Sequence, residues 1–376
     1  MTSSPASAAA AQPPAPDAVH PLDRDGLRGR VNQALTAFMD RQADVLSDVG
    51  TGMAPVTEAL RDFLLDGGKR LRPGFCYWGW RGAGGVDDGP AGDAAVRAAT
   101  SLELLQASAL IHDDLMDRSD TRRGKPAVHR RFEALHGASA WHGDGEGFGS
   151  AAALLLGDLC LTWSDEMFSG SGVDPVLLAA AKPLFDVMRT EVMAGQYLDV
   201  LEQAMGGGSV ERSRRVIRYK SAKYTIERPL HVGAALAGGG PELLAAYSAY
   251  GLPLGEAFQL RDDVLGVFGD PAETGKPAGD DLREGKRTVL LALAAERSGP
   301  TQTRLLDELV GDPALDDAGV KELRAVIEDT GALAEVESMI DALTESAIQA
   351  LAAAPITDEA KAVLYGLVEA ATVRRV

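Results

Sequence analysis

Apolar residues recur at spacings of three and four along almost the whole chain from Leu27 onward. Val31, Leu35 and Phe38 continue this pattern, and residues at such a spacing share one face of an α-helix. Few segments alternate apolar and polar residues at the period of two that a half-buried strand requires. The pattern therefore predicts an all-α protein.

Glycine-rich breaks of loop length separate the predicted helices. Beyond two helices that begin near Leu27 and Val56, the expected helices lie near residues 91–117, 150–168, 175–203, 210–236, 242–266 and 286–297. About four more follow Thr301, and one of them opens at Thr357 with two carboxylates in its first turn, which stabilise a helix N-terminus. Because the breaks are short and no tandem repeat is evident, we expect one domain over residues 25–376.

The N-terminal segment, residues 1–24, has a different composition. It is rich in Ala, Pro and Ser and carries too few apolar residues to build a core, which predicts a disordered tail. It lacks the basic start and apolar centre of a secretory signal, so none is expected.

Nothing in the apolar runs or the cysteines points to a membrane or an oxidising compartment. No later run is long and charge-free enough to span a bilayer, so we expect no stable membrane insertion. The two cysteines, Cys76 and Cys160, lie in apolar runs. Buried thiols in a reducing cytoplasm are therefore expected rather than a disulfide.

Acidic residues outnumber basic ones. The chain has 37 Lys and Arg against 55 Asp and Glu, a net charge of -18. This balance argues against nucleic acid and against an anionic membrane surface as partners. An anionic substrate must therefore be bound by cations that cluster locally.

Three carboxylates stand at the end of the helix predicted near 91–117. Asp113 and Asp117 are four residues apart and share one helix face, and Asp114 flanks them. They repel one another and oppose the helix dipole, so the cluster is locally unfavourable. A solvated acidic helix end is the ordinary explanation, but the preceding residues are apolar and should be buried. Carboxylates at the mouth of a buried helix suit Mg²⁺, which takes oxygen ligands and leaves sites for substrate phosphates.

Two arginines, Arg122 and Arg123, follow this cluster directly. Their guanidinium groups match phosphate oxygens, so a cation and arginines beside one pocket suggest a diphosphate. The whole segment resembles the first aspartate-rich motif of trans-isoprenyl diphosphate synthases, the polyprenyl synthetases. That motif is Asp-Asp-x-x-Asp followed by Arg-Arg-Gly. The resemblance implies a single large helical bundle around a central cavity (isoprenoid synthase type), Mg²⁺ as cofactor and a homodimer.

A second basic stretch precedes this motif. Lys69, Arg70 and Arg72 follow two glycines and precede Pro73. Helix-capping glycines explain part of it, but three cations within four residues can also form an anion site. The stretch is similar to the Gly-Gly-Lys-x-x-Arg-Pro motif of the family. By that resemblance Lys69 and Arg72 hold the diphosphate of isopentenyl diphosphate.

The later motifs complete the resemblance. Lys220-Ser221 resembles the Lys-Thr segment that contacts the allylic diphosphate. Asp262 and Asp263 resemble the second aspartate-rich motif, with one departure: Gly266 stands where many relatives have a third aspartate. The resemblance assigns the catalytic groups to Asp113, Asp114, Asp117, Asp262, Asp263 and Lys220, the metal ligands to Asp113, Asp117 and Asp262, and substrate binding to Lys69, Arg72, Gln106, Arg122, Arg123, Lys220, Ser221, Gln259, Lys276 and Lys286.

Several polar residues near the motifs receive plainer interpretations. Asp158 and Asp199 are expected to support the metal site or its neighbours rather than to bind the cation directly. Lys223 is expected to be an exposed lysine. His112 and His129 are expected to be ordinary hydrogen-bonded histidines, since no cysteine or second histidine stands at zinc spacing.

Product length is predicted from two small residues. Ser108 and Ala109 lie five and four residues before Asp113, about one helical turn. In relatives that stop at farnesyl diphosphate, bulky aromatic side chains fill this level and act as a floor. The resemblance therefore implies geranylgeranyl diphosphate as main product, with a longer polyprenyl diphosphate as the alternative. Close helix packing is the other explanation for two small side chains.

Two rival functions remain open at this stage. A class I terpene cyclase also uses an aspartate-rich helix and Mg²⁺, but it does not need the two basic motifs. A non-catalytic subunit of a heteromeric synthase should have lost motif residues, and here only the third aspartate is replaced.

Overall fold

The computed structural model of the chain describes residues 21–206, 208–269, 279–312 and 314–372, and these residues are almost entirely helical. The elements, in chain order, are η1 (Pro21–Asp23), α1 (Leu27–Val49), η2 (Thr51–Met53), α2 (Ala54–Leu65), α3 (Leu71–Gly82), α4 (Gly89–Met116), β1 (Thr121–Arg122), β2 (Lys125–Pro126), α5 (Val128–Ala138), α6 (Gly145–Ser169), α7 (Pro175–Met205), α8 (Val210–Val216), the π-helix η3 (Ile217–Glu227), α9 (Arg228–Leu236), α10 (Pro241–Phe268), α12 (Asp280–Arg283), α13 (Val289–Arg297), α14 (Pro300–Leu309), α15 (Asp317–Asp329), α16 (Ala332–Ala353) and α17 (Asp358–Thr372).

The predicted all-α fold is confirmed. The strands β1 and β2 are two residues each and form a short antiparallel hairpin. Several long helices begin at a proline, a residue that suits the first helical turn because its missing N–H has no partner there anyway. Pro175, Pro241 and Pro300 are the first residues of α7, α10 and α14, and Pro90 is the second residue of α4.

Helix α3 was not predicted from the sequence. Most of its residues are buried, including Trp78 and Trp80, so it has no polar face and no apolar stripe. It also contains Pro73 and several glycines, which are weak helix formers. A helix buried on nearly all sides leaves little periodic signal in the sequence.

Three residues of the predicted N-terminal tail, residues 1–24, are helical and packed on the bundle. Pro21–Asp23 form the 3₁₀ helix η1, which packs against α3 and α17. Leu22 is 3% exposed, and its carbonyl accepts a hydrogen bond from Trp78 Nε1 at 3.3 Å. The rest of the predicted tail, residues 1–20, lies outside the described residues.

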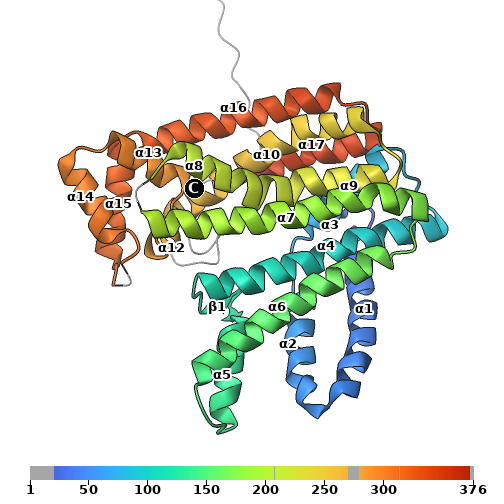
Figure 1. The fold of residues 1–376 in the computed structure, drawn as a ribbon. Coiled ribbons are helices and arrows are strands. Elements are labelled where there is room, and N and C mark those ends of the chain that lie inside the picture. The colour runs from blue at the N-terminus through green and yellow to red at the C-terminus, as the bar shows by residue number, and fades with distance from the viewer. Residues whose placement is uncertain (1–20, 207, 270–278, 313, 373–376) are drawn as a thin grey trace, which may run out of the picture.

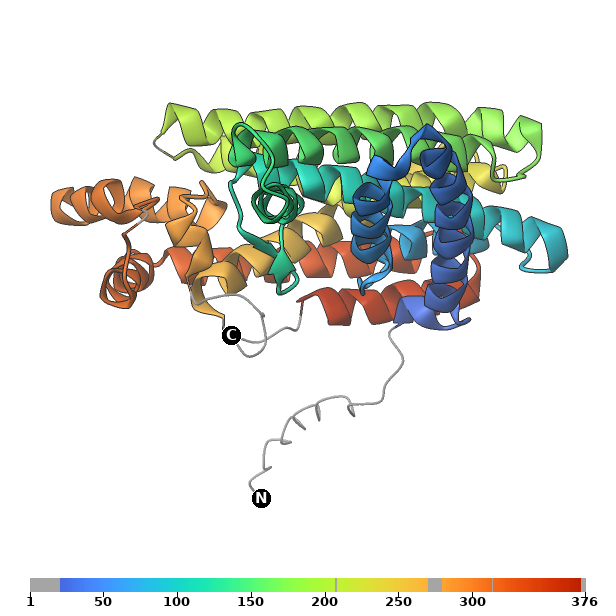
Figure 2. The ribbon, with the colours of Figure 1, turned by 90° about the horizontal axis from the view of Figure 1, so that it is seen from below.

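Long helices lie side by side across the molecule. Figure 1 shows α16 along one side, next to α10, with α7, α4 and α6 following towards the other side. Helices α1 and α2 form a hairpin that packs on α4. Helices α14 and α15 project from one end of the bundle, as both Figure 1 and Figure 2 show.

Two hydrophobic clusters form the interior. The larger one joins α1–α7 to α9, α17 and the N-terminal half of α10, and the smaller one joins the C-terminal half of α10 to α12–α16. Helices η3 and α10 contribute to both clusters: Tyr224 and Tyr250 belong to the larger, Ile217 and Leu260 to the smaller. Helix α16 also contributes to both clusters, through Leu351 to the larger and Ile340 to the smaller.

Candidate active site

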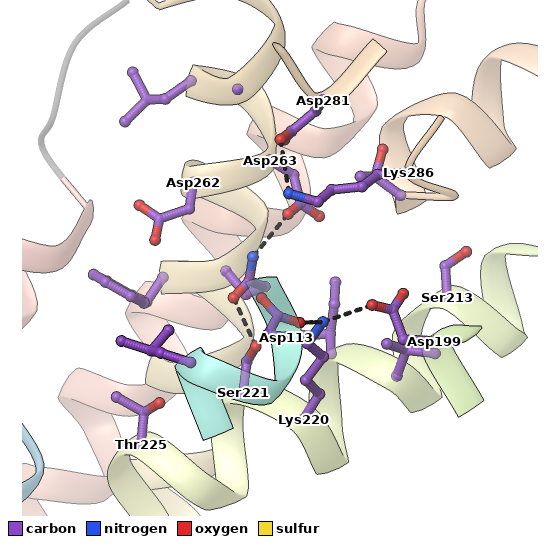
Figure 3. A pocket seen from close by; sticks show the side chains of 18 of the residues that line it. Asp113, Asp199, Ser213, Lys220, Ser221, Thr225, Asp262, Asp263, Asp281 and Lys286 are labelled. Carbon is purple, nitrogen blue, oxygen red and sulfur yellow. Dashed lines mark hydrogen bonds and ion pairs between the residues drawn. The ribbon is translucent and has the colours of Figure 1, made fainter. Parts of the chain in front are cut away.

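A cavity of about 920 Å³ lies between the ends of α4, η3 and α10. Its wall carries both carboxylates and cations, and Figure 3 shows many of them converging from different helices. The charged lining residues are Lys69, Arg72, Asp113, Arg122, Asp199, Lys220, Asp262, Asp263, Asp280, Asp281, Lys286 and Arg287. Residues from both aspartate-rich segments and from both basic segments therefore meet in one space.

Asp113 lies at the C-terminal end of α4 and is the centre of a charged network. Its carboxylate accepts hydrogen bonds from Lys220 Nζ at 3.0 Å and from Gln196 Nε2 at 2.9 Å. Lys220 also binds Asp199 Oδ2 at 2.6 Å. Burial opposes ionisation of Asp113, but the positive charges of Lys220, Arg122 and Lys286 together outweigh it and hold the pKa of Asp113 below its usual range. Asp113 is thus an ionised carboxylate at the cavity wall.

Asp114 was predicted to be catalytic, but it does not line the cavity. It is fully buried, and both of its oxygens accept hydrogen bonds from Arg122, with Nε to Oδ1 at 2.9 Å. Burial raises the pKa of Asp114 despite this partner. Asp114 therefore orients the Arg122 guanidinium, which does line the cavity.

Asp117 is the C-cap residue that directly follows α4. It is half-buried and is not among the cavity-lining residues. Burial, followed by the negative charge of Asp113, raises the pKa of Asp117 to about 6. The carboxylate repulsion expected from the sequence is present, and a cation bound between the two groups would relieve it.

The second aspartate pair lies on α10, across the cavity from Asp113. Asp262 and Asp263 both line the cavity. Gln259 Nε2 donates to Asp263 Oδ1 at 2.8 Å, and Ser221 Oγ donates to Gln259 Oε1 at 2.7 Å. Burial raises the pKa of Asp263 to about 8. The sequence analysis named all four residues, and the structure brings them together.

Gly266 stands where many relatives have a third aspartate, and the side chain of Asp281, which was not predicted as a site residue, lies beside it. A Cβ atom added at Gly266 would enter the space that the carboxylate of Asp281 already fills. Asp281, which belongs to α12, is buried, lines the cavity and accepts a hydrogen bond from Lys286 Nζ at 3.2 Å. Two adjacent aspartates shortly before Lys286 were the only signal for it in the sequence.

The basic stretch before α3 divides into one structural and two cavity-lining cations. Arg70 is buried, and its guanidinium donates to Glu103 Oε2 at 2.6 Å and to the Leu64 carbonyl at 2.7 Å. These bonds hold the loop that presents Lys69 and Arg72 to the cavity. Arg72 donates to Thr225 Oγ1 at 2.8 Å.

Gln106, Arg123 and Lys286 were also predicted to bind substrate. Gln106 lines the cavity, and within the described part of the chain its buried Oε1 has no hydrogen-bond partner. Arg123 does not line the cavity; its Nη1 donates to the carbonyl of Asp66 at 3.1 Å. Burial opposes the charge of Lys286, but Asp281 and Glu284 outweigh it and raise the pKa of Lys286.

The remaining polar predictions have mixed outcomes. Lys223 is not the exposed lysine expected, since its side chain is 12% exposed and binds Glu191. Asp199 lines the cavity, whereas Asp158 is largely exposed, 3.8 Å from His112, and does not. His129 is buried.

Two further predicted residues do not line the cavity, and the structure does not describe a third. Lys276 lies outside the described residues. Ser108 is fully buried and Ala109 half-buried, and neither is among the residues that line the cavity. The described part of the chain offers Ser108 Oγ no hydrogen-bond partner. Their role in product length stays a prediction.

The described carboxylates do not form a complete metal site without further ligands. Among residues 21–206, 208–269, 279–312 and 314–372, no three Asp, Glu, His or Cys side chains gather into a group that could hold a metal ion. Two of the candidate ligands, Asp113 on α4 and Asp262 on α10, instead line facing walls of the cavity, and the third, Asp117, directly follows α4. This open set of hard oxygen donors fits Mg²⁺, which commonly takes one or two carboxylates and completes its shell with water and substrate phosphates.

Comparisons with known proteins agree with this geometry. The sequence profile described as Polyprenyl synthetase matches residues 54–327. The chain is 33% identical to the geranylfarnesyl diphosphate synthase of Aeropyrum pernix, over 81% of this chain and 89% of that protein. It is 30% identical to the (2E,6E)-farnesyl diphosphate synthase of Mycobacterium bovis, over 84% and 83%. Its structure is similar to the crystal structure of the geranylgeranyl pyrophosphate synthase of Corynebacterium glutamicum complexed with isoprenyl diphosphate and magnesium, with a TM-score of 0.89, 45% identity and coverage of 93% and 99%.

Proposed function

Because this chain belongs to the polyprenyl synthetase family and is a trans-prenyltransferase, we propose that it condenses isopentenyl diphosphate with allylic diphosphates to give geranylgeranyl diphosphate. Residues 25–376 act as one synthase domain in this proposal, and the allylic substrates are the dimethylallyl, geranyl and farnesyl diphosphates. The observation that carries it is the meeting of two aspartate helices and two sets of cations around one cavity.

The cavity separates into two proposed diphosphate sites. Lys220, Lys286 and Arg122 stand with the aspartates and would bind the allylic diphosphate. Lys69 and Arg72 stand on the α2–α3 side and would bind isopentenyl diphosphate. A charge-assisted hydrogen bond contributes about 1.5–3 kcal/mol, so a few such contacts suffice to orient each substrate.

Mg²⁺ would be held by Asp113 and Asp117 from α4 and by Asp262 from α10. Bound there, it supplies Lewis-acid stabilisation of the departing diphosphate. Lys220 and Lys286 add positive charge at positions that their ion pairs with Asp199 and Asp281 fix in advance.

The apolar part of the wall protects the allylic cation that forms when the diphosphate leaves. Leu110, Val216, Ile217 and Phe258 line the cavity and limit the entry of water, which would quench the cation. The double bond of isopentenyl diphosphate then attacks, and a proton must be lost. Neither histidine nor glutamate is among the described residues that line the cavity, so the departed diphosphate is the proposed proton acceptor.

A product assay tests this function. The purified chain is incubated with Mg²⁺, isopentenyl diphosphate and each of the three allylic diphosphates in turn, and the products are sized. We expect the twenty-carbon diphosphate as main product from every primer. Cyclised hydrocarbon products would favour a terpene cyclase, and no elongation from any primer would favour a non-catalytic subunit.

Product length should respond to bulk on α4. In the double variant Ser108→Phe with Ala109→Phe, two rings would occupy the level one turn below Asp113. We expect the main product to shift from geranylgeranyl to farnesyl diphosphate while turnover continues. An active double variant with an unchanged product distribution would mean that the chain grows elsewhere, and the product would then have to be limited by other residues.

We further propose that the protein is a cytoplasmic homodimer. Both cysteines are buried free thiols, as a reducing compartment permits. Within the described residues, α6 is the one helix long and apolar enough by composition to cross a membrane, a property that the sequence analysis did not assign to it. It packs on α4 and α5, yet it leaves Leu154 and Leu155 exposed, and α7 leaves Tyr197 exposed. A second copy of the chain is the proposed cover for these apolar side chains.

The dimer is testable by mass in solution. Leu155, which is 61% exposed on α6, is replaced by aspartate to place a charge in the proposed interface. We expect the wild-type chain to have twice its sequence mass of 39.4 kDa and Leu155→Asp to approach the monomer mass. Val49→Asp on α1, where Val49 is also exposed, serves as the matched control and should stay dimeric. A monomeric wild-type chain would contradict the proposal.

A further inference from the structure

The helix that carries Lys220 and Ser221 is wound in an unusual way. Residues Ile217–Glu227 form a π-helix of 11 residues between two α-helical segments, α8 and α9. A π-helix bonds residue i to residue i+5, and most examples are single turns, frequently at functional sites. A π-helix of eleven residues beside the cavity is therefore unusually long, and the contacts around it should explain why it forms.

The winding changes which side chains share a face. In an α-helix with 3.6 residues per turn, residues five apart point about 140° away from each other. In a helix bonded from i to i+5, residues five apart are about one turn apart and point to the same side. Lys220 and Thr225 are five apart, and both line the cavity. The π-helix thus presents both residues to the same space.

These two residues reach opposite parts of the cavity. Lys220 Nζ binds Asp113 and Asp199, on the aspartate side. Thr225 Oγ1 accepts a hydrogen bond from Arg72 Nη2 at 2.8 Å, on the α3 side, and Arg72 also lies 4.2 Å from the ring centre of Tyr224. One turn of the π-helix therefore connects the two proposed diphosphate sites.

Helices α7 and α10 each have a glycine where they pack against η3, so the backbones can approach closely. A Cβ atom added at Gly195 of α7 would lie 2.5 Å from the backbone nitrogen of Lys220. One added at Gly255 of α10 would lie 2.6 Å from the Cα atom of Ala222. Both distances are shorter than real side-chain contacts, so η3 is held closely between two helices that lack side chains at these points.

A half-buried carboxylate on α7 joins the end of η3 to α9. Glu191 Oε1 accepts from Lys223 Nζ at 2.6 Å and from Arg228 Nη2 at 2.8 Å, and its Oε2 accepts from Arg228 Nε at 2.7 Å. Lys223 belongs to η3 and Arg228 begins α9. The three side chains are 12–15% exposed. Glu191 does not line the cavity, so it would act on the site through the elements that it contacts, of which η3 carries Lys220 and Thr225.

We propose that η3 is a fixed spacer between the two diphosphate sites and that Glu191 is the positioning residue that holds it. Lys220 and the Thr225–Arg72 pair then keep their separation and orientation while substrates bind and leave. This inference rests on the proposed function, because it takes the two diphosphate sites as assigned above.

The test compares Michaelis constants with stability. Glu191→Gln removes the charge that pairs with Lys223 and Arg228, and we expect it to raise the Michaelis constants for both substrates by about tenfold, the lower end of what a charge-assisted contact contributes. Asp186→Asn is the matched control: Asp186 lies on the same helix and pairs with Lys182 and Arg189, away from η3. It should leave both constants unchanged.

A second variant keeps the proposal testable even if Glu191→Gln does not fold. Thr225→Val removes the hydrogen bond to Arg72 and should raise the Michaelis constant for isopentenyl diphosphate by about tenfold, with the allylic constant unchanged. A folded Glu191→Gln that only melts at a lower temperature, or a Thr225→Val with both constants unchanged, would overturn the spacer. Absence of elongation by the wild-type chain would instead overturn the proposed function.

Discussion

Replacing Asp113 or Asp262 by alanine is expected to lower turnover at least 100-fold. The two carboxylates stand on α4 and α10, on facing walls of one cavity, where they would bind Mg²⁺ against the departing diphosphate. Removing one preorganised group that stabilises developing charge typically costs about 2.7–4 kcal/mol, or roughly 100- to 1000-fold in rate. Turnover at saturating substrate and Mg²⁺ measures the effect.

The helical fold of these variants should be intact, because both residues lie at the cavity rather than in a hydrophobic cluster. Circular dichroism checks this point. Asp158→Ala is the matched control, since Asp158 is a largely exposed aspartate on α6 that does not line the cavity. It should keep nearly full turnover. Near wild-type turnover in both Asp113→Ala and Asp262→Ala would refute the metal assignment.

The second large effect separates the two diphosphate sites. Lys69→Ala or Arg72→Ala should mainly raise the Michaelis constant for isopentenyl diphosphate, because both cations lie on the α2–α3 side of the cavity. Lys220→Ala should mainly impair the reaction of the allylic diphosphate, because Lys220 lies between Asp113 and Asp199. Each lost contact is worth about 1.5–3 kcal/mol, roughly 10- to 150-fold. Steady-state kinetics with each substrate varied in turn measures the split.

Arg123→Ala gives a useful comparison for this experiment. The sequence resemblance places Arg123 in the isopentenyl diphosphate site, but its guanidinium bonds the Asp66 carbonyl and does not line the cavity. We therefore expect a smaller effect than from Arg72→Ala. If the Lys69, Arg72 and Lys220 variants impair the use of both substrates equally, the assignment of two separate sites is wrong.

Local periodicity was sufficient to predict the all-α fold and most helix positions. The helix predicted near 91–117 corresponds to α4. It could be predicted because its apolar positions recur along a long uninterrupted run. The helix predicted near 286–297 begins later, at Val289. Helix α3 was missed, because nearly complete burial removes the polar positions that define a period.

The sequence motifs predicted many residues of the site but not the contacts between them. Asp113, Asp262 and Lys220 are far apart in sequence, yet all three line the same cavity in the structure. What the sequence could not reveal is which side chains pair across helices. Asp281 fills the space beside Gly266, and Glu191 pairs with the lysine that was expected to be exposed. These pairings depend on tertiary packing rather than on local spacing.

The most direct test of the account measures cation binding rather than turnover. Mg²⁺ is titrated by calorimetry into the purified chain with a non-cleavable allylic diphosphate analogue present, and the titration is repeated with the double variant Asp113→Asn, Asp262→Asn. We expect Mg²⁺ to bind the wild-type complex and to bind the double variant more than about tenfold more weakly, because carboxylates on α4 and α10 supply the protein ligands. Equal Mg²⁺ affinity in the two proteins would contradict this expectation.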